Sequence, residues 1–156
     1  MKAIKKTVTI VASFIIVGVI IVVLSLFKVP QKASSTGELT FVKKYHETGD
    51  VCYVDKLRAS GKYQILDIPE TEKFSKAGED KPVTYTVIGI TDEAFQGEAQ
   101  LEEIIIPSTI TSIGKNAFSG CTGITKVTFH GTKEEWEKIY IQDGNECLTD
   151  AAITFE

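Results

Sequence analysis

The sequence predicts a mainly β solenoid, in which short parallel strands form a ladder that ends in a helix-and-strand cap, preceded by one transmembrane helix. Three observations predict this architecture. An uncharged apolar segment occupies residues 7–27, a 23-residue repeat occupies the carboxyl-terminal half, and a helix-capping motif with a short apolar strand ends the chain. One solenoid domain with an appended membrane segment fits a chain of 156 residues.

Residues 7–27 have the length of a membrane-spanning helix. They include no charged side chain, and at about 1.5 Å per residue this run spans about 30 Å, the thickness of a bilayer's hydrocarbon core. Three lysines precede the run, and no acidic residue occurs before Glu38. Because positive residues stay on the cytoplasmic side, we expect a cytoplasmic tail at 1–6 and an extracytoplasmic remainder.

A cleavable signal peptide is the alternative interpretation of this segment. Signal peptides have a shorter apolar run, about 7–15 residues, followed by a site with small residues. The run here is longer, and the residues around Lys28 make a poor cleavage site, although Ala33-Ser34-Ser35 make a fair one. We therefore expect an uncleaved signal anchor, and export of the rest of the chain in either case.

Beyond the anchor, residues 28–38 are small and polar and are predicted to form a linker, with the repeat domain at 39–156. All 21 acidic residues but only 14 of the 17 lysines and arginines lie after Phe27, so this part carries a net charge of about −7. An acidic domain without a basic stripe gives no reason to expect nucleic-acid binding.

Cys52, Cys121 and Cys147 are odd in number and lack the spacing of a metal site. One disulfide with a free thiol is compatible with an exported domain. The alternative that we favour is that the cysteines are small buried apolar residues, because Cys121 falls inside the repeat.

A 23-residue repeat relates two segments of the sequence. Ile90, Ala94, Phe95 and Gly97 recur as Ile113, Ala117, Phe118 and Gly120. Apolar positions keep the same offset, from Leu101 to Ile124, from Ile104 to Val127 and from Ile106 to Phe129. A unit this short cannot bury its own apolar face, so neighbouring units must stack into a solenoid.

The flanks of the repeat contain degenerate units. Before it, strands are predicted at 39–43, 51–55 and 63–68, where Leu66-Asp67-Ile68-Pro69 mirrors Ile104-Ile105-Ile106-Pro107, and the polar insertion at 73–81 is predicted to be a surface loop. After it, Thr132 and Glu135 fit a capping box, which predicts a helix from Lys133 to about Tyr140 that turns Trp136 inward. Residues 153–155 should form a closing strand.

These motifs resemble the BspA-type leucine-rich repeats of bacterial and some protist cell surfaces. The strongest likeness covers about residues 83–155, through Ile113-Gly114-Lys115-Asn116-Ala117-Phe118-Ser119-Gly120-Cys121 and its counterpart, and through Asn145-x-x-Leu148 near the end. The resemblance implies surface exposure and protein binding, including adhesion to host or matrix proteins, with no shared catalytic residues and no cofactor. Glu98 stands where the family pattern leads us to expect a cysteine opposite Cys121.

Catalytic and metal-binding motifs are not evident in the sequence. His46 and His130 have no Cys, Asp or Glu at zinc-ligand spacing. Asp92 and Glu93 are expected in a solvated turn, with calcium ligation as the remote alternative. We therefore predict a non-enzymatic module that binds a protein partner, and as the alternative a structural or accessory subunit of an envelope complex.

Strand alternation predicts the partner-binding residues. If Ile104 and Val127 face inward, then Glu103, Ile105, Lys126 and Thr128 face outward, and Asp67 extends the same surface. Ile105 would be the apolar centre of this patch. The alternatives are that Ile105 is incidentally exposed or is covered by the insertion at 73–81.

The topology can be tested with protease added to intact cells or spheroplasts. The domain after Gly37 should be digested, while an amino-terminal tag should be spared, because the anchor holds that tag inside. Full protection of the carboxyl end would contradict the orientation, and a mature chain beginning near Thr36 would show that the anchor is cleaved.

Overall fold

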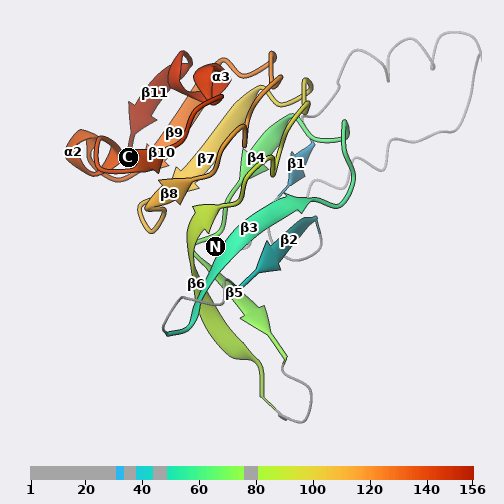
Figure 1. Ribbon diagram of the computed structural model, residues 1–156, viewed down its shortest axis with the longest axis vertical. Helices are drawn as coiled ribbons and strands as arrows, with labels where there is room; N and C mark the ends of the chain where they lie inside the picture. Colours follow the sequence, from blue (N-terminus) through green and yellow to red (C-terminus); the bar gives the residue numbers. More distant parts are fainter. Residues whose placement is uncertain (1–30, 34–37, 44–48, 76–80) are drawn as a thin grey trace, which may run out of the picture.

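The computed structural model describes residues 31–33, 38–43, 49–75 and 81–156 as two β-sheets with two short helices near the carboxyl end (Figure 1). The first sheet is parallel throughout and has the spatial order β1 (Lys32–Ala33), β4 (Ile65–Asp67), β7 (Glu103–Pro107), β9 (Lys126–His130), β11 (Ala152–Phe155). The second has the order β10 (Tyr140–Ile141), β8 (Ser112–Ile113), β6 (Val83–Ile90), β3 (Val51–Leu57), β2 (Leu39–Val42), with β5 (Thr71–Phe74) also paired to β6. The helices are α2 (Lys133–Trp136) and α3 (Glu146–Thr149).

Successive coils each contribute one strand to each sheet, and the 23-residue period sets their register. Ile104 pairs with Val127 and Ile106 pairs with Phe129, and all four side chains are fully buried. The rings of Phe95 and its repeat counterpart stack with centroids 5.2 Å apart. The predicted repeat, the inward-facing positions and the parallel ladder are confirmed.

The period extends to backbone conformation and to hydrogen bonds. Glu93 and Asn116, one period apart, both have positive φ angles, of 57° and 55°. The N–H groups of Glu93, Phe95 and Gly97 donate to carbonyl oxygens in the next coil at 2.8–2.9 Å. Each turn of the coil therefore repeats the one before it, and the two are held together by main-chain hydrogen bonds.

The insertion before the repeat differs from the prediction. The sequence predicts a loop at residues 73–81, but Lys73 and Phe74 belong to β5, which pairs antiparallel with β6. Ile65 pairs with Glu103, an offset of 38 residues instead of 23, and the hairpin β5–β6 occupies the additional length. The hairpin extends from the rest of the fold in Figure 1. The polar sequence forms a strand because the longer β6 provides a pairing edge.

The carboxyl-terminal cap confirms part of the prediction. Thr132 and Glu135 form the reciprocal capping box, and the closing strand is present as β11. The sequence predicts a helix that reaches Tyr140, but α2 ends at Trp136, because Tyr140 and Ile141 pair with Ser112 and Ile113 as β10. Trp136 turns inward as expected, with its ring centroid 5.4 Å from that of Phe129.

The described residues of the predicted linker, 28–38, include a strand that is part of the domain. Lys32 and Ala33 form β1, and Ala33 is fully buried. Gln31 is fixed through its N–H, which donates to the Gln64 side chain at 2.7 Å, and through its carbonyl, which accepts from the Gln64 and Ile65 N–H groups. The first sheet therefore begins within the predicted linker.

The anchor predicted at residues 7–27 lies outside the described residues. Among the residues that are described, no helix is both long enough and apolar enough to cross a membrane.

Stability measurements can test the register. Phe118→Ala should lower the free energy of unfolding by about 3–5 kcal/mol, because it empties a fully buried aromatic site. Gln96→Ala, an exposed neighbour of the other stacked ring, should change it by less than about 0.5 kcal/mol. Denaturant unfolding that shows equal effects for the two variants would contradict the assigned register.

Candidate partner-binding surface

The outer face of the parallel sheet, opposite the buried Ile104 and Val127, carries the four residues predicted to bind a partner. Glu103 pairs with Lys126, and Ile105 pairs with Thr128. Asp67 pairs with Ile105 from the other side. The structure therefore brings together all four predicted residues, with Asp67 extending the row as the sequence suggests.

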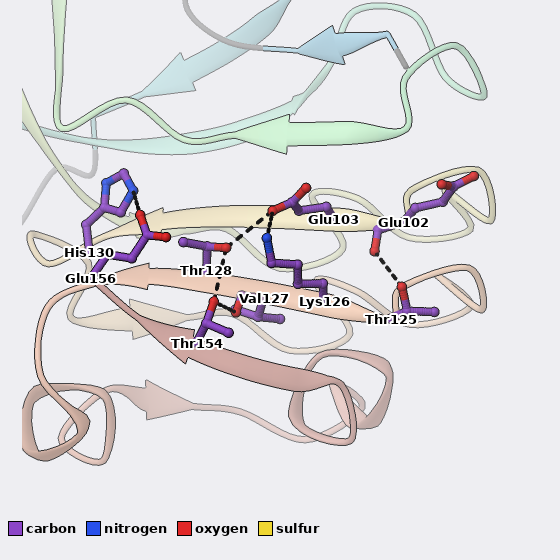
Figure 2. A network of polar contacts seen from close by, with 9 residues as sticks. All are labelled: Glu102, Glu103, Thr125, Lys126, Val127, Thr128, His130, Thr154 and Glu156. Carbon is purple, nitrogen blue, oxygen red and sulfur yellow. Dashed lines mark hydrogen bonds and ion pairs between the residues drawn. The ribbon is translucent and has the colours of Figure 1, made fainter. Parts of the chain in front are cut away.

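A chain of polar contacts crosses β7, β9 and β11 on this face (Figure 2). Lys126 Nζ lies 2.7 Å from Glu103 Oε1, and the Thr128 hydroxyl donates to the same carboxylate at 3.3 Å. The Thr154 hydroxyl lies 3.3 Å from that of Thr128. The hydrogen bond to Glu103 and the attraction of its charge raise the pKa of Lys126.

Thr128 differs from the prediction in its exposure. It points outward, yet only 4% of its surface is accessible, because side chains of neighbouring strands lie across it. The alternation of side chains along a strand predicts on which side of the sheet Thr128 points. It does not predict how far the side chains of neighbouring strands cover Thr128. An approaching molecule would therefore meet Glu103 and Lys126, with side chains 26% and 49% exposed, rather than Thr128 itself.

Ile105 lies half-buried between two surface ion pairs. One pair joins Glu103 and Lys126, and the other joins Lys32 and Asp67 at 2.7 Å. The β5 strand of the polar insertion pairs in the second sheet, where Phe74 packs on Phe41 and Tyr85, so β5 does not cover Ile105. The remaining residues of the insertion, 76–80, lie outside the described part of the chain.

The cysteines are free thiols, and two of them belong to the core. Burial raises the pKa of the Cys52 thiol to about 11, with a further contribution from the negative charge of Glu72. Burial likewise raises the pKa of Cys121 to about 11, and its thiol donates to the Phe95 carbonyl at 3.0 Å. The prediction of buried apolar cysteines is confirmed for these two, whereas Cys147 is half-buried.

Asp92 and His130, the described residues considered for a metal site, both make contacts within the fold. Asp92 accepts a hydrogen bond from the Lys115 N–H at 3.0 Å, so it ties two coils together. His130 is exposed at the end of β9, with Nε2 3.8 Å from a Glu156 carboxylate oxygen. No cluster of three or more His, Cys, Asp or Glu suited to a metal occurs within the described residues, and His46 lies outside them.

Two buried polar residues have structural roles that the sequence does not indicate. Asn145 donates to the Gly114 and Gln142 carbonyls and accepts from the Phe118 N–H, at 2.7–3.0 Å. Glu98, at the position where the family pattern predicts a cysteine, is 5% exposed and accepts the Gly61 N–H at 2.7 Å. In the sequence Asn145 is notable only as part of the motif near the end of the chain. Glu98 is a single polar residue within a coil, and nothing in the residues around it indicates that it is buried.

Comparisons with known proteins support the same architecture. The family model described as "BspA type Leucine rich repeat region (6 copies)" matches residues 83–145. A leucine rich cell surface protein from Faecalibacterium prausnitzii has a similar structure, with 19% identity and a TM-score of 0.55 over 77% of this chain and 29% of that one. A leucine-rich repeat protein from Bacteroides capillosus gives 14% identity and a TM-score of 0.50 over 78% of this chain and 96% of that one. The search of curated proteins found no match.

The chain spans less than a third of the Faecalibacterium protein. At these identities the two structures show a shared fold. The family match coincides with the stacked coils that carry the 23-residue register, so residues 83–145 form a BspA-type leucine-rich repeat region.

Proposed function

We propose that this chain is a membrane-anchored cell-surface module that binds a protein through the outer face of its parallel sheet. The observation that supports this proposal most directly is the register of the parallel strands β4, β7 and β9. This register sets Ile105 between Asp67 and Thr128 and places Glu103 beside Lys126. Stacked coils thereby turn residues distant in sequence into one continuous surface, the kind that solenoids use for extended contacts.

The surface has the composition of a small contact patch. A partly exposed β-branched residue, Ile105, forms its centre, and charged side chains surround it. Apolar centres with polar rims are common at protein interfaces, where the centre contributes most of the binding energy. Thr128 supports the patch from below, because its hydroxyl binds the Glu103 carboxylate.

The position outside the cell rests on the amino-terminal sequence. Residues 7–27 supply an apolar run of spanning length with lysines on one side, which favours a single-pass anchor with its amino end inside. The Faecalibacterium relative is described as a cell surface protein. Adhesion to a host or matrix protein is the form of binding that we propose.

Substitutions on the outer face test this proposal once a pull-down from intact cells has identified a partner. Ile105→Asp combined with Lys126→Glu should weaken binding at least about 30-fold, because it removes the apolar centre and reverses the rim charge. The melting temperature should fall modestly, because the new carboxylates face Asp67 and Glu103 on the paired strands, but the variant should remain folded since neither side chain is fully buried.

A matched control is available on the second sheet. Tyr140, which is 69% exposed, and the exposed Lys138 can be changed to Asp and Glu, which introduces the same charge change away from the outer face. This control should keep full affinity. Equal affinity of the Ile105/Lys126 variant and wild type would place the site elsewhere, with the insertion at 73–81 as the next candidate. Capture of membrane proteins alone would favour the accessory-subunit role over adhesion.

A further inference from the structure

The folded domain begins close to the predicted anchor. Gln31 is held beside the parallel sheet, because its N–H donates to the Gln64 side chain and its carbonyl accepts from two N–H groups at the start of β4. Only residues 28–30 separate Gln31 from the anchor predicted at residues 7–27. An extended chain from Phe27 to Gln31 reaches at most about 14 Å, which limits the distance between Gln31 and the hydrocarbon core.

Removal of the anchor by cleavage would damage this part of the fold. The fair cleavage site, Ala33-Ser34-Ser35, overlaps the end of β1, so a cut behind it would remove β1. Ala33 is fully buried, and the N–H groups of Gln64 and Ile65 would lose the carbonyl that they donate to. The fold therefore favours a chain in which the domain stays attached to the anchor.

Residues 58–63 form the first of a series of stacked turns within the described residues. This turn connects β3 to β4, and the Gly61 N–H donates to the Glu98 side chain in the next turn at 2.7 Å. The N–H groups of Phe95 and Gly97 extend the stack to the turn after that. Figure 1 shows β1 and β2 at one end of the solenoid and β10 and β11 at the other. The turn at 58–63 therefore lies at the end that adjoins the anchor.

The two ends of the solenoid differ in charge. Residues 28–63 contain seven lysines and arginines and four acidic residues, whereas residues 64–156 contain seven and 17. The first turn contributes the exposed Arg58 and Lys62 and contains no acidic residue. Lys32 lies nearby, but it is already paired with an aspartate. An anionic surface would therefore attract the amino-terminal end and repel the other.

The distance to the bilayer suits this attraction. Headgroups extend about 5–8 Å beyond the hydrocarbon core on each side, and the Debye length at physiological ionic strength is about 8 Å. With Gln31 within about 14 Å of the core, the neighbouring turn lies within reach of headgroup phosphates. The guanidinium of Arg58 and the ammonium of Lys62 can both donate charge-assisted hydrogen bonds to phosphate oxygens.

We propose that the amino-terminal end of the solenoid docks, through Arg58 and Lys62, on anionic phospholipid headgroups of the membrane that holds the anchor. The acidic carboxyl-terminal coils then point away from the bilayer, and the outer face of the parallel sheet remains accessible at the side. This inference rests on the membrane anchor of the proposed function, but not on the residues of the protein-binding patch.

Paramagnetic relaxation measures this orientation in the full chain. The chain is placed in nanodiscs of phosphatidylglycerol or of phosphatidylcholine, each with a trace of lipid whose headgroup carries a gadolinium chelate. In phosphatidylglycerol the amides of residues 58–63 should relax fastest. Those of β11, four strand spacings or about 19 Å from β1, should relax slowest. In phosphatidylcholine, or at about 1 M salt, where the Debye length falls to about 3 Å, this contrast should shrink.

Charge reversal tests the two cations. Arg58→Glu with Lys62→Glu should abolish the excess relaxation at residues 58–63 in phosphatidylglycerol discs, because the phosphates then repel the turn. Lys133→Glu with Lys138→Glu makes the same charge change at exposed positions at the other end of the solenoid, and it should preserve the excess. Both variants should remain folded, since they alter only exposed side chains.

Three results would overturn the proposal. The first is equal relaxation of residues 58–63 and β11 in phosphatidylglycerol discs, and the second is faster relaxation at another surface. The third is the same contrast in both lipids and in the Arg58/Lys62 variant, which would show that the short connection alone sets the distance. In all three the chain stays in the disc. Chains that separate from the discs would instead refute the anchor, which is a failure of the proposed function itself.

Discussion

The structure depends on one constraint: a single coil cannot bury its own apolar side chains, so each coil must lie on the next in a fixed register. Main-chain hydrogen bonds from Phe95 and Gly97 to the following coil set that register, and the stacked phenylalanine rings fill the space between the coils. A shift of one residue would turn every inward side chain outward. The repeated apolar positions and the repeated backbone angles satisfy the same requirement.

The ends of the solenoid meet this constraint in different ways. Among the described residues the first sheet begins at β1, where the buried Ala33 lies beside the charged Lys32. Near the carboxyl end the Asn145 side chain accepts the Phe118 N–H, whereas the equivalent Phe95 N–H donates to a main-chain carbonyl, and the same side chain donates to two carbonyls. Phe155, on β11, is 39% exposed.

The sequence is sufficient to predict features that repeat or follow a local rule. The offset of 23 residues identifies the buried positions, alternation identifies the outward ones, and the spacing of Thr132 and Glu135 identifies a helix start. Features that depend on distant neighbours could not be predicted in this way. The burial of Thr128 and the early end of α2 arise from strands far away in the sequence, and β5 forms because the neighbouring β6 offers it a pairing edge. Their local residues carry no trace of those contacts.

Residue-resolved amide hydrogen exchange tests the stacking most directly. The amides of Glu93, Phe95 and Gly97 donate across coils, so they should exchange only when the coils separate, with an opening free energy close to that of global unfolding. Replacing Asn145 with alanine should release the Phe118 amide while those three remain protected, because they donate to main-chain carbonyls whereas the Phe118 N–H donates to the Asn145 side chain. Rapid exchange of Phe95 and Gly97 in the wild-type chain, comparable to that of solvent-exposed loops, would contradict the stacking of the coils in this register.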